Sequence, residues 1–366
     1  MGSPPTSALS DFSTEAINVV VRCRGRNDKE ILLKSSVVVD VPNKTGTKEV
    51  NLNTSDDTSV VGKISSTKTF LVDQVFGPGA DQDLIFEGVA SPLFDEFLKG
   101  FNCTVFAYGQ TGTGKTYTMC GDDKLVNGSY SPNAGIIPRV LFNLFEKLEN
   151  DTSLKNDFIV KCSLVEIYNE SLKDLLNPRN NRKELKIYEE CIKTLLGKPD
   201  KTLVYIKDLE EYCVKNARDG LQLLNRGLND RKTSSTNMNK TSSRSHTIFS
   251  LSLFKKEGDT EYRHSKMNLV DLAGSENISR SGATEQQAKE AGSINRSLLS
   301  LGKVINALVD NKLPPYRDSK LTRLLKDSLG GETKTVLIAN ISPSKMDCDE
   351  TAKTLEYASK AKNVMN

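Results

Sequence analysis

Eight consecutive residues, from Gly109 to Thr116, have the types and the spacing of a phosphate-binding loop. They read Gly-Gln-Thr-Gly-Thr-Gly-Lys-Thr and match the pattern GxxxxGK followed by Ser or Thr at every fixed position. The glycines let backbone N–H groups turn inward and form a concave anion site at the start of a helix. Lys115 can bring a positive charge to the β- and γ-phosphates, and the Thr116 hydroxyl can ligate Mg²⁺. We therefore predict a nucleotide-phosphate site whose contacts are Gln110, Thr111, Gly112, Thr113, Gly114, Lys115 and Thr116.

The base of the nucleotide is constrained by a motif that the sequence lacks. GTPases of the Ras type read guanine with a segment of the form NKxD. The two nearest segments here begin at Asn43 and at Asn311, and they continue as Lys-Thr-Gly and Lys-Leu-Pro, without the Asp. GTP is therefore disfavoured. A kinase, a transporter subunit and a motor all remain open on these residues alone.

Two further segments could detect the γ-phosphate of a nucleotide. The segment 239–246, NKTSSRSH, is rich in hydroxyls and carries the cation Arg244. The segment 271–276, DLAGSE, follows the apolar end of a predicted strand. Asp271 is placed there like a Walker-B carboxylate, and Gly274 is free to turn its N–H toward a phosphate.

The elements that must position these residues alternate along the chain. Runs of β-branched residues predict strands, and apolar residues at helical spacing predict helices. We predict strands over 17–21, 104–108, 158–168, 247–254, 265–270 and 335–341, and a meander of hairpins over 31–70. We predict helices over 84–99 and 217–226, a mainly helical region after 282, and a last helix over 349–362. This alternation, without a linker-like break, predicts one α/β domain with helices on both faces of a sheet.

Composition argues against several other classes of protein. The 366 residues include 50 Lys and Arg and 47 Asp and Glu, a net charge of +3, so no global basic field for nucleic acid exists. The seven cysteines contain no CxxC pair, which favours reduced thiols in the cytosol or nucleus, and only two histidines argue against a zinc site. No apolar run approaches the roughly 20 residues of a membrane span. We therefore expect neither a nucleic acid nor a membrane as a partner.

The three phosphate segments, GQTGTGKT, NxxSSRSH and DLAGSE, resemble the P-loop, switch I and switch II of the kinesin superfamily. The similarity runs from about residue 18 to residue 366, and three long motifs in this order make it specific. Myosins share the architecture, but they have other residues in the P-loop and after the Ser-Ser-Arg of switch I. The resemblance implies a P-loop NTPase fold of the kinesin and myosin type, with a mostly parallel mixed central sheet, helices on both faces and a small β-hairpin subdomain. It also implies microtubule-stimulated hydrolysis of ATP with Mg²⁺, coupled to force along microtubules.

The resemblance assigns roles to the switch residues. Ser243 would ligate Mg²⁺ and help to position the attacking water. Arg244 and Glu276 would form the salt bridge that closes the site, with Glu276 relaying a proton through a second water. Gly274 would donate its N–H to the γ-phosphate, and Asp271 would hold a Mg²⁺-bound water. The predicted catalytic residues are Ser243, Arg244, Gly274 and Glu276, and the nucleotide set also includes Asn239, Ser242 and Asp271.

The adenine base is expected between the first strand and the residue after the P-loop. Kinesins use an RxRP segment there, and this chain has Arg22 and Arg24 followed by Gly25 in place of the proline. Tyr117 can stack on the ring, as the family's aromatic residue does. His246, the last residue of the switch I segment, can serve either acid–base chemistry or a hydrogen-bonded structural role, and the structural role is favoured.

A second functional surface is predicted toward the end of the chain. An amphipathic helical stretch over 301–309 leads into 314–323, and the two resemble the helix–loop–helix that kinesins press onto tubulin. Basic residues recur there about one helical turn apart, so they share a face that can meet an acidic filament. The basic region 179–201 is either a second tubulin-facing lobe or a basic linker loop. The predicted microtubule contacts are Arg280, Arg317, Lys320 and Arg323.

Three features resemble the kinesin-5 subfamily of bipolar spindle motors. They are Asn102-Cys103-Thr104 before the P-loop strand, the insert 121–133, and the segment 271–282. The alternative is another plus-end-directed N-terminal kinesin of the transport type. The insert itself is either a variable surface loop or a regulatory element. The subfamily implies action on the cytoskeleton and the mitotic spindle, in the cytoplasm or within the nucleus.

The resemblance also divides the chain. We predict a flexible leader over 1–16, a motor domain over 17–362 and the start of a neck linker over 363–366. The sequence contains no coiled-coil heptad region. We expect the head alone to be monomeric and the full-length protein to be a homo-oligomer joined through a stalk outside this sequence. Because switch II leads within about ten residues into the filament-facing helix, we expect ATP state and filament affinity to be reciprocally coupled.

Overall fold

The computed structural model describes most of the chain. The described residues are 16–54, 67–122, 124–151, 157–177, 184–192, 201–234, 243–257, 261–276 and 285–366. Three residues of the predicted sites, Asn239, Ser242 and Arg280, lie outside these ranges. The same holds for most of the basic residues between 179 and 201.

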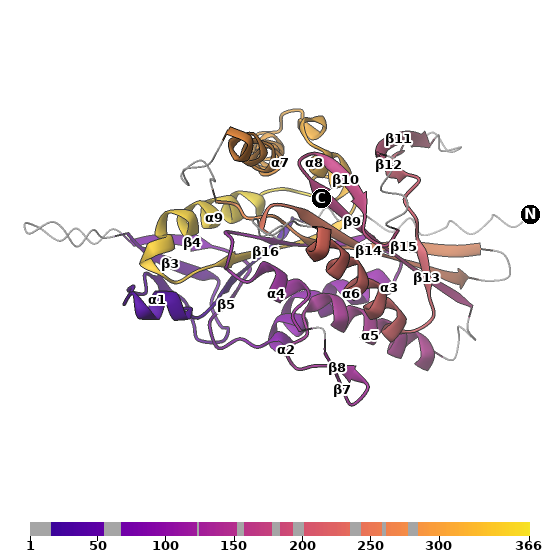
Figure 1. The fold of residues 1–366 in the computed structure, drawn as a ribbon, viewed down its shortest axis with the longest axis horizontal. Coiled ribbons are helices and arrows are strands. Elements are labelled where there is room, and N and C mark those ends of the chain that lie inside the picture. The colour runs from indigo at the N-terminus through magenta and orange to yellow at the C-terminus, as the bar shows by residue number, and fades with distance from the viewer. Residues whose placement is uncertain are drawn as a thin grey trace, which may run out of the picture.

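A mixed β-sheet forms the centre of the molecule (Figure 1). The strand order is β10-β9-β14-β15-β6-β16-β1-β5, with β13 paired to the side of β9. The five neighbours β15, β6, β16, β1 and β5 are parallel, whereas β10, β13 and β14 pair antiparallel with β9. The strands are β1 Asn18–Cys23, β5 Gln74–Phe76, β6 Cys103–Tyr108, β9 Phe158–Tyr168, β10 Ser171–Asp174, β13 Tyr212–Val214, β14 His246–Glu257, β15 Glu261–Asp271 and β16 Lys334–Ile341. The predicted mixed sheet is confirmed.

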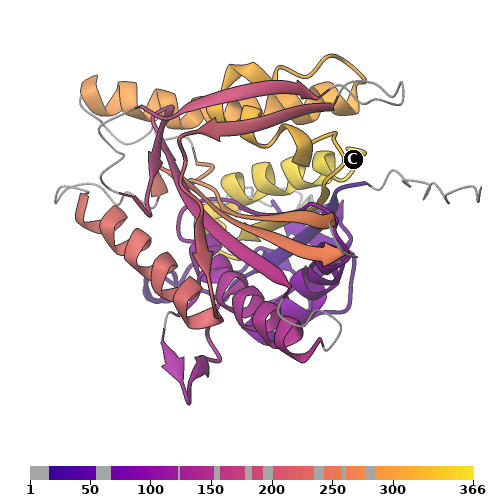
Figure 2. The same ribbon diagram turned by 90° about the vertical axis from the view of Figure 1, so that its right-hand side faces the viewer.

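Helices cover both faces of this sheet, and each face has its own hydrophobic core. In Figure 1 the helices α2 to α6 lie below the sheet and α7, α8 and α9 lie above it, and Figure 2 shows the same layers from the side. The helices are α1 Asp28–Leu32, α2 Gln82–Ile85, α3 Ser91–Leu98, α4 Lys115–Met119, α5 Ile136–Asn150, α6 Ala217–Ser234, α7 Glu285–Val309, α8 Lys320–Leu324 and α9 Cys348–Ala361. Every residue of β6 is buried, as expected for a parallel strand covered on both sides. Among the described residues, no helix is long and apolar enough to cross a membrane.

Two predicted elements differ from the structure. The meander predicted from residue 31 begins later, as the three-stranded sheet of β2 Val39–Asp40, β3 Glu49–Asn53 and β4 Thr67–Leu71. Residues 31 and 32 belong instead to α1, because Asn27 and Glu30 form a capping box that starts a helix. The helix predicted over 84–99 is divided into α2, a π-helical turn and α3. That turn contains Gly88, where an added Cβ would lie 2.6 Å from the ring of Phe76.

The two ends of the described chain lie against each other. The backbone N–H of Ile17 donates to the carbonyl of Val364 at 2.9 Å, and Val364 is buried. Asn366 accepts a hydrogen bond from the N–H of Gly330. Residues 363–366, the predicted start of a neck linker, are therefore packed against the domain.

Candidate nucleotide site and filament-facing surface

The P-loop connects β6 to α4 and depends on glycine for its shape. Gly109, Gly112 and Gly114 have φ angles of 143°, 82° and 100°, in the region that L side chains rarely adopt. A Cβ on Gly109 would lie 2.1 Å from the carbonyl oxygen of Asn340. The first glycine of the motif thus lets the loop pass close to β16.

Lys115 is folded into the loop that precedes it. Its Nζ donates to the carbonyl oxygens of Gly109 at 2.9 Å and Gln110 at 3.0 Å, and only 7% of the residue is exposed. Burial lowers the pKa of this ammonium, while the nearby carboxylates of Asp271 and Glu276 oppose the shift. The loop therefore holds a cation in a place of low dielectric, where its attraction for phosphate is weakly screened.

Asp271 meets Thr116 at the carboxyl ends of neighbouring parallel strands. Because β15 and β6 pair in parallel, Asp271 lies beside Ala107, two residues before the P-loop begins. The Thr116 hydroxyl donates to Asp271 Oδ2 at 2.6 Å. Burial raises the pKa of Asp271, opposed by this hydrogen bond and by Lys115.

The donor set around Thr116 fits a magnesium ion. Oδ1 of Asp271 is buried and has no hydrogen-bond partner among the described residues. A hydroxyl beside a carboxylate with an oxygen still available is the kind of oxygen-donor arrangement that Mg²⁺ prefers. The predicted ligand Ser243 is joined to switch II, because its carbonyl oxygen accepts the N–H of Gly274 at 3.0 Å.

Switch II is bonded to the P-loop as well as to switch I. The carboxylate of Glu276 accepts the backbone N–H of Thr111 at 2.8 Å and also the Thr111 hydroxyl. The N–H of Ser275 donates to the carbonyl of Gly109 at 3.1 Å. A Cβ on Gly274 would lie 2.3 Å from Thr111 Oγ1 and from a carboxylate oxygen of Glu276, so a larger residue would displace the side chains that join the two loops. The salt bridge between Arg244 and Glu276 stays a prediction.

Sequence reasoning missed a buried ion pair behind switch I. Arg231 of α6 and Glu166 of β9 lie 3.0 Å apart and are almost fully buried. Arg231 Nη2 donates to Ser245 Oγ at 2.7 Å, and that hydroxyl donates to Glu166 at 2.6 Å. The three residues come from separate elements, and no local pattern marks them as partners.

The predicted base-binding residues divide between two roles. Arg22 is buried, and its Nη1 donates to Gln82 Oε1 and Thr118 Oγ1, both at 2.9 Å. Burial lowers the pKa of Arg22 to about 10. Its guanidinium also lies over the exposed ring of Tyr117, 5.4 Å from the centroid. Arg22 thus supports the ring that is predicted to stack on adenine.

Arg24 braces the P-loop from the outside. Its Nε donates to the carbonyl of Gly112 at 2.7 Å, and its Nη2 lies 2.6 Å from a carboxylate oxygen of Glu30. This ion pair lowers the pKa of Glu30 to about 2. At Gly25 an added Cβ would find its nearest neighbour, Pro78 Cβ, at 4.0 Å, so this position has room for a Cβ. Gln110, another predicted contact, donates to Asp347 at 3.1 Å.

The three predicted filament contacts that the structure describes pair with acidic residues in or just before one hairpin. Arg317 lies in a single 3-10 turn, Tyr316–Asp318, and α8 follows directly. Glu189 accepts from Arg317 at 2.9 Å and lies 3.0 Å from Arg323. Lys320 lies 3.1 Å from Glu184. The Arg317 side chain is 80% exposed, whereas those of Lys320 and Arg323 are 24% and 28% exposed.

Both acidic partners belong to the predicted second basic region. Glu189 is in β11 Lys186–Ile192, which pairs with β12 Lys201–Lys207, and Glu184 precedes β11. The described part of the region is therefore a hairpin rather than a linker loop. Its acidic residues face the cations of α8 and of the turn before it. The guanidinium groups of Arg317 and Arg323 lower the pKa of Glu189. We call this set of ion pairs, Arg317, Lys320 and Arg323 with Glu189 and Glu184, the α8 face.

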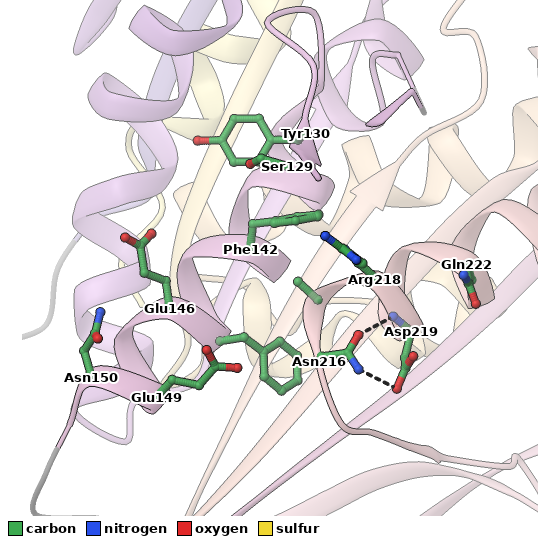
Figure 3. Close-up of a pocket in the computed structure, with 12 residues that line it drawn as sticks. Ser129, Tyr130, Phe142, Glu146, Glu149, Asn150, Asn216, Arg218, Asp219 and Gln222 are labelled. Carbon is green, nitrogen blue, oxygen red and sulfur yellow. Dashed lines mark hydrogen bonds between the residues drawn. The ribbon is translucent and has the colours of Figure 1, made fainter. Parts of the chain in front are cut away.

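The insert 121–133 forms the short hairpin of β7 Leu125–Val126 and β8 Ser129–Tyr130. Tyr130 packs edge-on against Phe142 of α5, and Arg218 of α6 donates to the carbonyl of Gly128 at 3.2 Å. A hollow of about 850 Å³ lies between the hairpin, α5 and α6, with the carboxylates of Glu146 and Glu149 along one wall (Figure 3). At its end the insert reaches the nucleotide site, because the Asn133 carbonyl accepts from Gln82 at 3.2 Å.

Comparison with known proteins supports the same reading. The Kinesin motor domain family model matches residues 22–364. Kinesin-like protein CIN8 of Eremothecium gossypii is 50% identical over 406 residues, which is 98% of this chain and 42% of that protein. Kinesin-like protein KIF11-A of Xenopus laevis is 48% identical over 370 residues, which is 98% of this chain and 33% of that protein. The chain thus spans less than half the length of these curated relatives.

A solved structure extends the comparison to the fold. The structure of a fast kinesin superposes with a TM-score of 0.81 at 38% identity and covers 96% of this chain and 92% of the other. The predicted P-loop NTPase fold is therefore confirmed, and the relatives confirm the predicted resemblance to kinesin-5 motors. The chain belongs to the kinesin motor domain family.

Proposed function

We propose that this chain is the catalytic head of a kinesin-5 motor. It hydrolyses ATP with Mg²⁺ under stimulation by microtubules and converts the reaction into force along them. In the whole protein, a homo-oligomer through a stalk, the heads slide antiparallel microtubules during assembly of the mitotic spindle. The observation that carries the proposal is the closure of three loops on one another, since both switch I and the P-loop are hydrogen-bonded to switch II.

The side chains of this closed set suit phosphoryl transfer, which needs positioning and charge more than covalent help. Lys115 and the backbone N–H groups of the P-loop would hold the β- and γ-phosphates. Thr116 and Ser243 would hold Mg²⁺, with Asp271 orienting its water shell. A bound Mg²⁺ would neutralise charge on the phosphates. Gly274 would exchange its bond to Ser243 for one to the γ-phosphate.

Glu276 has a different task in this proposal. Its carboxylate now accepts two hydrogen bonds from Thr111, so it is held at the rim of the P-loop. From there it can turn toward Arg244 and take a proton from the attacking water through a second water. The change of partner would accompany closing of the site. Asn239 and Ser242, which precede Ser243 closely in sequence, would complete the contacts to the nucleotide.

The filament would bind at the α8 face and along α7. Arg317 is the most exposed cation of the face and would make the outermost contact, with Arg280 adding to the surface near the start of α7. Switch II ends nine residues before α7 begins, so a change at Gly274 is close in the chain to the filament side. ATP state and filament affinity would then be coupled in both directions.

The test is steady-state ATP hydrolysis with and without stabilised microtubules, in the wild type and in Glu276→Ala. We expect strong stimulation of the wild type and a fall of roughly 10²- to 10³-fold in the variant, as for loss of a group that acts in the transition state. Glu149→Ala is the matched control, because this carboxylate is exposed on α5 and belongs to neither site. Hydrolysis that is indifferent to microtubules would leave a P-loop switch with another partner.

A further inference from the structure

His246 lies where switch I, switch II and α7 meet. Its ring is 2% exposed, and both ring nitrogens are hydrogen-bonded. Nδ1 lies 3.0 Å from the backbone nitrogen of Ala273 in switch II, and Nε2 lies 2.7 Å from Ser297 Oγ on α7. His246 is the last residue of the switch I segment and the first residue of β14.

The direction of both hydrogen bonds follows from the chemistry of the partners. A backbone N–H can only donate, so Nδ1 must accept from Ala273. The proton of a neutral ring is then on Nε2, which donates to the Ser297 hydroxyl. Burial, with Arg231 and Lys115 acting in the same direction, lowers the pKa of His246 to about 3. The ring is therefore neutral at physiological pH, and its tautomer is set by switch II.

The backbone next to His246 is held in place by hydrogen bonds of Ser245. Ser245, its neighbour in the chain, receives hydrogen bonds from Arg231 and donates to Glu166. This buried ion pair of Arg231 and Glu166 joins α6 to β9 of the central sheet. A ring that is fixed at its backbone and bonded to two other elements can pass a displacement of one to the other.

The displacement that His246 would pass on is a movement of switch II. Ala273 is next to Gly274, whose N–H donates to Ser243 in this structure and would bind the γ-phosphate in the proposed reaction. A rotation of the peptides at 273 and 274 would change the hydrogen bond at Nδ1. Ser297 is buried on α7, the helix that the proposed function places toward the filament.

We propose that the His246–Ser297 hydrogen bond is a positioning contact that couples the nucleotide switches to α7. In this proposal, His246 and Ser297 act through Ala273 and through the position of α7, and not by direct contact with substrate or filament. The inference rests on the proposed function, since it needs a filament that binds on the α7 side. It adds a specific mechanical connection, apart from the chain between switch II and α7.

The experiment compares Ser297→Ala with Ser300→Ala in this chain. Both serines are buried on α7, but the hydroxyl of Ser297 is the one bonded to His246. We measure ATP turnover without microtubules, the maximal stimulated turnover, and co-sedimentation with microtubules in ADP and in a non-hydrolysable ATP analogue. For Ser297→Ala we expect basal turnover within about twofold of the wild type. Stimulation, and the difference in affinity between the two nucleotide states, should each fall about tenfold.

The outcomes separate the two proposals. A wild type that microtubules do not stimulate refutes the proposed function. A stimulated wild type and a Ser297→Ala variant with unchanged stimulation and unchanged nucleotide-dependent affinity refute only the coupling. Ser300→Ala should behave like the wild type, and equal losses in both variants would also refute the coupling, because they would indicate general damage to α7. Ser297→Thr keeps a hydroxyl and should retain at least about half of the stimulation.

A spectroscopic measurement tests the contact without relying on turnover. The chain has two histidines, so ¹⁵N-labelled imidazole signals can be assigned by comparison with His264→Gln. We expect His246 to be a neutral Nε2–H tautomer across physiological pH, with a slowly exchanging proton that exchanges faster in Ser297→Ala. A ring protonated on Nδ1, or a proton whose exchange does not depend on Ser297, would overturn the geometry on which the coupling depends.

Discussion

The phosphate site and the α8 face both depend on charged side chains, but they place these charges in opposite surroundings. In the phosphate site, Lys115 and Asp271 are buried and bonded to backbone carbonyls or a hydroxyl. In the α8 face, Arg317 extends into solvent, and each cation pairs with a carboxylate of the neighbouring hairpin. The phosphate site therefore keeps its charged groups fixed in place without a ligand. In the α8 face, the neighbouring carboxylates neutralise the cations when no ligand is bound.

The difference sets how much each charge can contribute. Breaking a buried pair leaves a charge without compensation and costs about 3–5 kcal/mol, whereas an exposed ion pair contributes about 0.2–1 kcal/mol. Burial also shifts pKa values in the phosphate site, downward for Lys115 and upward for Asp271. We therefore expect substitutions in the phosphate site to abolish function and substitutions in the α8 face to reduce it gradually, with a dependence on salt.

The largest effect is expected for Lys115→Met. The substitution removes the charge that faces the phosphates and leaves the carbonyls of Gly109 and Gln110 without their donor. We expect stimulated ATP turnover to fall by at least roughly 10²-fold, measured at saturating microtubules. Lys147→Met is the control, since this lysine is half exposed and pairs with Asp95 at the surface. Comparable losses in both variants would mean that burial does not distinguish the two kinds of charge.

For Asp271→Asn we expect a smaller loss of activity than for Lys115→Met, together with unchanged or increased stability of the folded protein. The amide keeps the shape but cannot help to hold Mg²⁺, so we expect the apparent Mg²⁺ affinity to fall by about 10- to 100-fold. Stability without nucleotide should stay the same or increase, because the buried carboxylate is costly to ionise. Turnover at varied Mg²⁺ and thermal unfolding of the nucleotide-free head measure the two effects.

The stability difference between Asp271→Asn and the wild type should depend on pH in a predictable direction. The pKa of Asp271 in the folded protein is raised above its ordinary value of 3.8, so the folded state binds the proton more tightly than the unfolded state. Its contribution to stability is therefore favourable at low pH and is lost as pH rises through the folded pKa. The advantage of Asp271→Asn should be full at pH values above the folded pKa and shrink as pH falls through the interval between the two pKa values. If the stability advantage of Asp271→Asn did not change with pH, this would contradict a raised pKa of the buried Asp271 carboxyl group.

The phosphate site was largely predictable from the sequence, and the α8 face only in part. The P-loop and switch II are continuous segments, and the parallel pairing of β6 with β15 brings their ends together. A local signal for α1, the capping box of Asn27 and Glu30, was present in the sequence but was overlooked. The sequence was sufficient to predict which segments meet where the candidate site consists of consecutive residues that follow predictable strands.

The partners of the predicted cations could not be found in the same way. Arg317 and Glu189 are 128 residues apart, and Arg231 and Glu166 are 65 apart. No periodicity connects residues at such distances, and Glu189 lies in a region whose lysines and arginines suggested a basic surface. Which carboxylate pairs with which cation depends on the path of the chain in three dimensions. Counting charges along the sequence therefore overestimated the positive charge of the α8 face, whose cations are each paired with a carboxylate.

The smallest effect is expected for Arg317→Ala, and it tests the graded half of the comparison. The guanidinium is exposed and pairs with Glu189, so its removal costs the surface one cation without burying an unpaired group. We expect the affinity for microtubules to fall by roughly two- to fivefold at low salt, with basal turnover unchanged. Co-sedimentation over a range of ionic strength measures this, and the difference from the wild type should vanish as salt screens the surface.

Lys147→Ala is the matched control for Arg317→Ala. Lys147 is on α5, its side chain is 52% exposed, and it pairs with Asp95 at 2.7 Å. If affinity depended only on net charge, both variants would weaken binding equally, because each removes one exposed cation. We expect a larger loss for Arg317, since Glu189 holds its guanidinium beside that of Arg323 and so orients two cations together. A salt-independent loss of more than roughly tenfold for Arg317→Ala would instead place this residue with the buried charges of the phosphate site.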